Sequence, residues 1–397
     1  MKAIRFRVDK LKGKRFSDLE DAQGHQYVDL VQEGGGVLGI ALVGYTYVLE
    51  MAGIRFYSLA GTSAGAINTL MLAGMGNIQE AKSEKILRML CEKELFDLVD
   101  GNKSVRHIIR KAVKKEGGIG WDLLFRGVGI FRTLRDKLGM NPGDNFIQWI
   151  THELAREGVN TLSDLTKLRE QLPDGLVNVC DGSAIVNKEP RLAIITSDIT
   201  SHSKIEFPAM APLYWKDPHR ISPALLARAS MSIPFFFQPF EVDDVPNAGE
   251  SGTALWYKHV RYAGRIPEKV KFVDGGMLSN FPINVFHRED RGVPLMPTFG
   301  ARLSAYREYC SKPDSLLPMI GAMVNTMRQI YDYDFLLKHP DYSQLICRID
   351  ADQDFNWLDF DMDDGKKISL FNHGMRKAVE FLEKFEWEGY KKLRAKD

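Results

Sequence analysis

A serine between two glycines is the clearest candidate for chemistry in this sequence. Ser63 is the centre of a G-x-S-x-G pentapeptide that begins at Gly61 and ends at Gly65. A strand-like segment, 54–60, precedes the pentapeptide and small residues follow it, which is the strand–turn–helix context of a nucleophile elbow. At so sharp a turn a Cβ two residues away on either side would crowd the backbone, so both glycines are needed. We predict that Ser63 is a nucleophile, with a chance pentapeptide in a loop as the alternative.

A glycine-rich loop follows an expected strand at 27–32. Its glycines are Gly34, Gly35, Gly36 and Gly39. Their spacing also spells the dinucleotide-binding fingerprint, which requires an acidic residue about 20 positions further on. The next expected strand ends at 59–60 without an Asp or Glu, so the nucleotide interpretation is weak. We predict instead that bare N–H groups of this loop stabilise an oxyanion when Ser63 attacks a carbonyl. A glycine turn that only permits close packing is the alternative.

A serine nucleophile needs a base, and histidine is the usual one. The nine histidines are His25, His107, His152, His202, His219, His259, His287, His339 and His373. None has a context that marks it as a base, although His202 follows shortly after an expected strand end and His373 stands between Asn372 and Gly374.

Asp274 is a more informative candidate for the base. It ends the apolar strand expected at 269–274 and is followed by Gly275 and Gly276. The two glycines let the backbone turn away, so that the carboxylate projects into a cleft. An ordinary Asp-Gly β-turn is the alternative.

With its glycine-rich loop, its G-x-S-x-G elbow and its Asp-Gly-Gly motif, in that order along the chain, the sequence resembles the patatin-like phospholipase family. The resemblance covers residues 27–286 and includes two further segments, LAIITSDI at 192–199 and ARASMSIPFFFQP at 227–239, which are similar to the family's middle strand and its A-S-x-S-I-P segment. It implies that Ser63 is the nucleophile and Asp274 the sole base of a Ser–Asp dyad. The reaction would be acyl transfer through an acyl-serine that water resolves.

The resemblance also implies an oxyanion hole lined by Gly34, Gly35 and Gly36, and no metal or organic cofactor. Glu33 stands where the family usually has Asp, and we expect no catalytic consequence. A lone carboxylate is a weaker base than imidazole, with an ordinary pKa of about 3.9. Catalysis would therefore depend on a fixed Ser–Asp hydrogen bond, the oxyanion donors and the dipole of the helix that follows the serine.

The elements that must position these residues alternate as strand, turn and helix, which implies an α/β fold with a parallel sheet covered by helices. The family resemblance implies a three-layer fold with a central, mainly parallel sheet. We predict one catalytic domain at 1–300, including a charged helical insert near 77–172, and a mostly helical C-terminal extension at 301–397 packed on it. Within that extension we expect helical residues at 313–339, a short strand at 344–349 and one terminal helix at 369–394.

Composition narrows the classes of partner and compartment. The 397 residues carry 53 Lys and Arg against 52 Asp and Glu, a net charge of +1, so a nucleic-acid polymer is not favoured as a ligand. The four cysteines form no C-x-x-C pair, which argues against a zinc site or a disulfide framework. Residues 1–16 lack the apolar core of a secretory signal, and the uncharged stretch 57–79 is interrupted by glycines and polar residues. We expect a cytoplasmic protein with peripheral contact to the inner membrane face.

The resemblance implies a membrane phospholipid as substrate and a role in lipid degradation. The segment 121–135 interleaves aromatic residues with Arg126, Arg132 and Arg135, which suits either an interfacial patch or a packed helical cap. Some bacterial members of the family are antiviral effectors activated by a cyclic oligonucleotide. Our hypothesis is that this chain is one of them, and that Arg126, Arg132, Arg135 or Arg302 binds the activator. A homo-oligomer is left open. The alternatives are a constitutive lipase or carboxylesterase without nucleotide control, and a non-catalytic lipid-binding protein, which the intact Ser63 and Asp274 disfavour.

Overall fold

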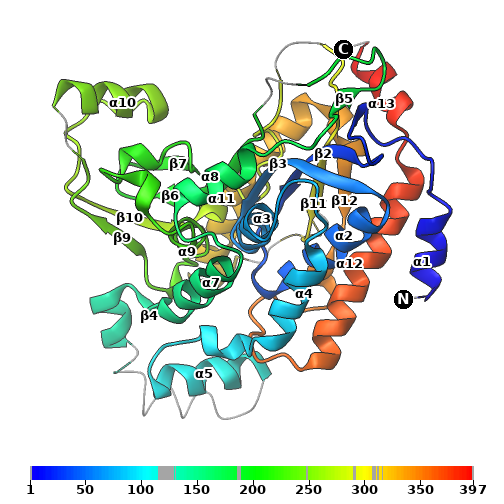
Figure 1. The fold of residues 1–397 in the computed structure, drawn as a ribbon. Coiled ribbons are helices and arrows are strands. Elements are labelled where there is room, and N and C mark those ends of the chain that lie inside the picture. The colour runs from blue at the N-terminus through cyan, green and yellow to red at the C-terminus, as the bar shows by residue number, and fades with distance from the viewer. Residues whose placement is uncertain are drawn as a thin grey trace.

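Helices cover both faces of a central sheet in the computed structural model of this protein (Figure 1). The structure describes residues 2–114, 129, 131–185, 189–246, 249–288, 292–305, 310, 313–314 and 316–395. In this part of the chain, no helix combines the length and the hydropathy that crossing a bilayer requires.

The central sheet runs in the order β12-β11-β2-β3-β6-β10-β9. The bounds of these strands are Ile346–Arg348, Thr298–Arg302, Gln26–Gln32, Ile54–Thr62, Leu192–Asp198, Lys269–Asp274 and Phe240–Asp243. Pairing is parallel from β12 to β6, whereas β10 runs antiparallel to both β6 and β9. The predicted α/β class is confirmed, with a sheet that is mixed rather than purely parallel.

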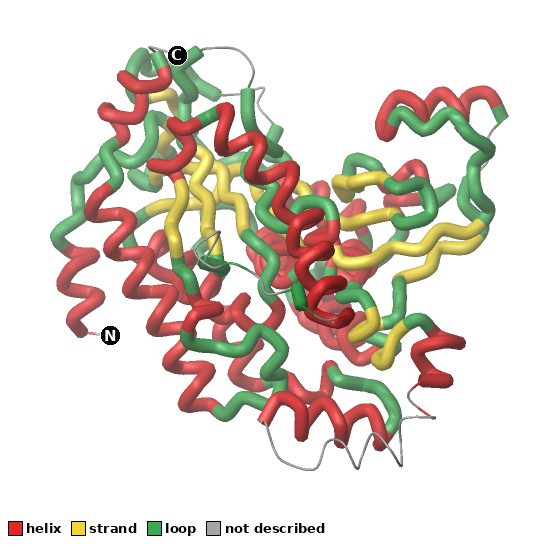
Figure 2. Tube along the Cα trace, turned by 180° about the vertical axis from the view of Figure 1, so that it is seen from behind, coloured by secondary structure: helices red, strands yellow, loops and turns green. Residues whose placement is uncertain are grey.

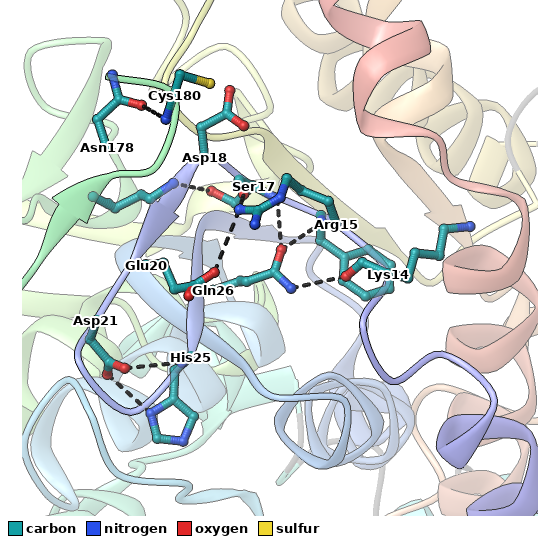
Figure 3. Close-up of polar contacts among 12 residues, drawn as sticks. Lys14, Arg15, Ser17, Asp18, Glu20, Asp21, His25, Gln26, Asn178 and Cys180 are labelled. Atoms are coloured by element: carbon teal, nitrogen blue, oxygen red, sulfur yellow. Dashed lines mark hydrogen bonds and ion pairs between the residues drawn. The ribbon is translucent and has the colours of Figure 1, made fainter. Parts of the chain in front are cut away.

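Shorter strands extend the sheet at its margins. β7 (Ser203–Phe207) pairs with β6, and β1 (Leu19–Glu20) pairs with β2 and β5 (Val177–Asn178). A separate parallel pair is formed by β4 (Gly139–Asn141) and β8 (Phe235–Phe237). The N-terminal residues are fastened to this margin by Gln26, whose Oε1 accepts from the N–H groups of Phe16 and Ser17 and whose Nε2 donates to the Lys14 carbonyl (Figure 3).

The centre of the core is β3, in which all nine residues are buried. A strand covered on both faces reads as a near-continuous apolar run, which explains why the sequence of β3 lacks alternation. Next to it lie α2 (Gly39–Met51) and α3 (Ala64–Gly74), the helices that follow the glycine loop and the serine turn. Both are apolar on nearly every side, as expected of helices enclosed by other elements.

A glycine pair brings α2 against α12 (Asp364–Lys384). A Cβ on Gly44 of α2 would collide with the Phe371 carbonyl of α12, and a Cβ on Gly374 of α12 would collide with the Ala41 carbonyl of α2. The two backbones are therefore in direct contact, and a C-terminal helix fixes the helix that carries the glycine loop.

The remaining helices complete the two outer layers. Their bounds are α1 Lys2–Asp9, α4 Ser83–Glu92, α5 Lys103–Lys114, α7 Asp144–Arg156, α8 Leu162–Glu170, α9 Ala224–Ser230, α10 Glu250–Val260, α11 Leu316–Lys338 and α13 Trp387–Arg394. Helix α11 lies behind the sheet in Figure 1 and in the foreground of Figure 2. Several helices thus come from the predicted insert at 77–172, and three come from beyond residue 313.

One expectation for the C-terminal part is wrong, and one strand there was not expected. The single helix predicted at 369–394 is two helices, α12 and α13, because the chain is extended at Phe385, whose ring is buried against Phe299 with 4.8 Å between ring centroids. The sequence analysis also missed β11, and the boundary placed at residue 300 falls inside that strand. The division into domains stays a prediction, but the C-terminal residues contribute two strands to the central sheet as well as helices.

Candidate active site

Strand register brings Ser63 and Asp274 to the same level of the sheet. Thr62, the last residue of β3, pairs with Ile195 of β6, and Asp274, the last residue of β10, pairs with the next residue, Thr196. The two candidate residues therefore flank β6 although they are 211 positions apart in the sequence. The Ser63 hydroxyl lies near enough to the Asp274 carboxylate to lower its pKa.

Ser63 occupies a strained backbone conformation. Its φ of 52° is in the left-handed region that an L-residue rarely adopts, as expected at a nucleophile elbow. Its N–H donates to the Ser230 hydroxyl at 2.9 Å, and that hydroxyl donates to the Ile195 carbonyl at 2.5 Å. The elbow is thus tied to β6 through a serine whose role the sequence analysis did not identify.

The glycines on either side of the elbow are required by contacts. A Cβ on Gly61 would collide with the backbone of Gly65, and a Cβ on Gly65 would collide with the Gln32 carbonyl of β2. The steric reason given for the pentapeptide therefore applies in the folded chain. It also shows that the elbow packs directly on the strand that leads to the glycine loop.

Asp274 is a buried carboxylate with the properties of a base. Burial raises the pKa of Asp274 above its ordinary value, while the Ser63 hydroxyl, the charge of Arg328 and the Gly276 N–H act in the opposite direction. The Gly276 N–H donates to Oδ1 of Asp274 at 2.7 Å. The net increase brings this carboxylate closer to the proton affinity that a general base needs near neutral pH.

The glycine loop adjoins Ser63, but its four glycines differ in what they offer. The Gly34 N–H already donates to the Asn280 carbonyl at 3.0 Å, and the Gly39 N–H donates to the Gly36 carbonyl. The N–H groups of Gly35 and Gly36 make no hydrogen bond to any described residue. Gly34 matters for space, because a Cβ there would lie 2.6 Å from Oδ1 of Asn280 and 3.0 Å from Cβ of Ser63.

Glu33 holds the loop in place. Its carboxylate accepts from the N–H groups of Leu303 and Ser304 at 2.6 and 2.9 Å, from the Ser304 hydroxyl at 2.6 Å and from Nδ2 of Asn280 at 3.0 Å. Burial raises the pKa of Glu33, and the hydrogen bonds from Ser304 oppose that increase. The sequence analysis gave Glu33 no such function, and Asn280, four residues beyond Gly276, was missed altogether.

Two cavities adjoin the loop and differ in character. One opens beside Ser63 and is lined almost entirely by apolar side chains, among them Ile67, Met71, Met89, Trp149 and Phe237. The other, which we call the polar cavity, lies against Gly34 and Gly35 and is lined by polar and apolar groups in about equal measure. Phe237 belongs to the segment 227–239 that the family resemblance includes, and it forms part of the wall of the apolar cavity.

The histidines with the most suggestive sequence contexts lie elsewhere. His202 is exposed in the turn after β6, and Nε2 of His373 contacts the Ile349 carbonyl at 2.7 Å. A His–Asp pair does occur, with Nδ1 of His25 at 3.0 Å from Oδ2 of Asp21 (Figure 3). His25 precedes β2, whereas Ser63 follows the parallel strand β3, so they stand at opposite edges of the sheet.

Asp332 of α11 anchors the chain just beyond Asp274. Its carboxylate accepts from the Phe281 N–H and from the Ser279 hydroxyl, both at 2.7 Å. Burial raises the pKa of Asp332 from 3.8 to about 7, and these two hydrogen bonds oppose the increase. Between pH 3.8 and 7 the folded protein therefore holds a proton that the unfolded chain has released.

We expect Asp332→Asn to weaken the dependence of stability on pH. Because the folded state binds the additional proton, the free energy of unfolding falls as pH rises through this window, and Asn cannot contribute to that fall. Urea unfolding at pH 5 and pH 8 should show a smaller difference in Asp332→Asn than in the unchanged protein. Asp334→Asn, at an exposed position of the same helix, is the control. An equally steep fall in Asp332→Asn would contradict the assignment.

Known proteins are similar to this chain in sequence. The model of the family described as patatin-like phospholipase matches residues 30–287 of the chain. The uncharacterized protein YqhO of Bacillus subtilis (strain 168) is 29% identical over 363 residues, which cover 91% of this chain and 100% of YqhO.

Two solved structures align with most of the chain at 15% identity. They are VipD from Legionella pneumophila, with a TM-score of 0.43 over 96% of this chain and 73% of that one, and the ExoU–SpcU complex of the Pseudomonas aeruginosa type III secretion system, with a TM-score of 0.40 over 90% and 51%.

Proposed function

The chain belongs to the patatin-like phospholipase family of carboxylic ester hydrolases, and from this premise we propose that Ser63 and Asp274 are its catalytic dyad. The observation that carries the proposal is the placement of the strained Ser63 and the buried Asp274 at the same level of the sheet, on either side of β6. The family implies a phospholipid substrate, and the apolar cavity beside Ser63 suits one of its acyl chains.

The reaction then follows from the geometry. Oγ of Ser63 attacks the ester carbonyl and its proton passes to Asp274. The negative charge that develops on the carbonyl oxygen is stabilised by the N–H groups of Gly35 and Gly36 and by the N-terminus of α3. When the intermediate collapses, Asp274 returns the proton to the departing alkoxide and an acyl-serine remains. Water attacks this ester while Asp274 takes its proton, and Asp274 then returns that proton to Oγ of Ser63 as the fatty acid leaves.

Phospholipid vesicles provide the test of this function. The purified protein should release fatty acid from phosphatidylcholine vesicles, and a fluorophosphonate probe should block the release while labelling one residue, Ser63. Mass spectrometry of the labelled peptide checks the position. Fatty acid release without labelling of Ser63 would contradict the dyad, and the absence of both labelling and release from any lipid ester would favour the non-catalytic lipid-binding alternative.

Control by a cyclic oligonucleotide and the antiviral role stay predictions from the sequence. Most of the segment 121–135, including Arg126, lies outside the described residues. Of its other two arginines, Arg132 is exposed and Arg135 pairs with Asp136 at 2.7 Å. Running the vesicle assay with and without a panel of cyclic di- and trinucleotides tests the regulation. Equal initial rates with and without the cyclic nucleotides would indicate a constitutive lipid acyl hydrolase.

A further inference from the structure

A cation reaches the candidate dyad from a part of the chain outside the family match. Arg328 belongs to α11, which contacts the turn formed by Gly275–Met277. Nε of Arg328 lies 3.4 Å from the point where a Cβ on Gly276 would stand. The same point is 2.8 Å from Oδ1 of Asp274 and 2.7 Å from Oδ1 of Asn280. The guanidinium therefore lies beside the reacting groups.

Arg328 and Asn280 both have unused hydrogen-bonding capacity. Among the described residues the partly buried guanidinium of Arg328 makes no hydrogen bond or ion pair. Asn280 is 7% exposed, its Nδ2 is engaged by Glu33 and Gly34, and its Oδ1 has no partner. Leaving polar groups unpaired in such a place is costly, so a bound ligand that pairs with them would gain affinity.

The polar cavity offers that ligand a site. It is lined by Gly34, Asn280 and Arg328, and it lies on the other side of the glycine loop from the apolar cavity. The buried carboxylates that line it, Glu33 and Asp332, are already occupied by hydrogen bonds from the protein, and burial raises the pKa of both.

We propose that this polar cavity binds the phosphodiester group of a glycerophospholipid, with Arg328 as the cation that recognises it. The inference rests on the proposed function, because it places the head group on one side of the loop when the acyl chain occupies the other. A guanidinium suits this ligand, since its fork of donors matches two phosphate oxygens. Oδ1 of Asn280 is then placed to accept from the glycerol hydroxyl that acyl transfer releases.

The test compares two substrates that differ only in the phosphate. Phosphatidylcholine and diacylglycerol with identical acyl chains are presented in the same detergent micelles, and kcat/KM is measured for each. Arg328→Gln should lower kcat/KM for phosphatidylcholine by about 10- to 100-fold, the usual effect of losing a charged hydrogen bond. The value for diacylglycerol, measured at a pH well above the acid limb set by Asp274, should change less than about threefold. Arg328→Lys should recover part of the loss, because it keeps the charge without the fork.

Lys338→Gln is the matched control, since it removes a positive charge from the exposed end of the same helix. It should leave both substrates unchanged. An unchanged rate on phosphatidylcholine in Arg328→Gln would overturn the proposal, as would an equal loss on both substrates, which would assign Arg328 to the dyad or to folding. If the proposed Ser63–Asp274 dyad were wrong, Ser63→Ala would still hydrolyse both lipids. That result distinguishes a failure of the proposed function from a failure of the Arg328 proposal.

Competition separates a lipid head group from free phosphate. Glycerophosphocholine should inhibit diacylglycerol hydrolysis by the unchanged protein more strongly than inorganic phosphate at the same concentration and ionic strength, and it should lose this effect in Arg328→Gln. Equal inhibition by both compounds would overturn the assignment to a phospholipid head group.

Discussion

Ser63→Ala is expected to lower fatty acid release by at least about 10³-fold, because no other group replaces an attacking oxygen on a strained turn. Fluorophosphonate labelling should disappear as well. Folding should be nearly unaffected, since the change removes one small hydroxyl and leaves the Ser63 N–H bonded to Ser230.

Three measurements check this first prediction: fatty acid release, probe labelling and the free energy of unfolding in urea. Ser343→Ala, at an exposed serine distant in sequence from the dyad, should behave like the unchanged protein. Hydrolysis at the normal rate by Ser63→Ala would end the serine mechanism.

Asp274→Asn should lower kcat by about 10²- to 10⁴-fold, the usual contribution of a positioned general base. An amide cannot take the Ser63 proton, although it fits the same space and can still accept from the Gly276 N–H. In the unchanged protein, activity should fall as pH decreases through the pKa of Asp274, because the protonated carboxyl is no longer a base. That acid limb should lie above the ordinary value of 3.8, since burial raises this pKa.

The pH profile of Asp274→Asn, in which the acid limb should be absent, is the decisive measurement. His25→Gln and His202→Gln are the matched controls and should keep most of the activity. A loss in either histidine variant as large as that in Asp274→Asn would replace the dyad with a triad.

The elbow and the Asp-Gly-Gly turn could be predicted because their signals are local. A strand, a glycine-flanked serine and a helix lie within about twenty residues, and the steric demand on Gly61 arises inside that segment, whereas that on Gly65 comes from Gln32 and Glu33. The pairing of Ser63 with Asp274 is not a local signal. It was predicted only because the chain resembles a family in which these motifs work together.

Groups that support the site gave no comparable signal. Ser230, Asn280 and Arg328 are ordinary polar residues whose importance comes only from contacts across the fold. β11 was missed because Pro297 and Gly300 are typical of loops. In the folded chain Gly300 is required, since a Cβ there would lie 2.5 Å from the Phe281 ring.

The attachment of the glycine loop to late parts of the chain sets the order in which the enzyme matures during synthesis. Glu33 is bound by Leu303 and Ser304, the Val37 N–H donates to the Trp357 carbonyl, and α2 rests on α12. Ser63 and its elbow leave the ribosome hundreds of residues before these partners exist. We therefore expect a growing chain to carry the nucleophile without a fixed glycine loop, and hydrolysis to begin only after α12 has emerged and docked. With this order of events, a half-made hydrolase would not attack the cell's own membranes.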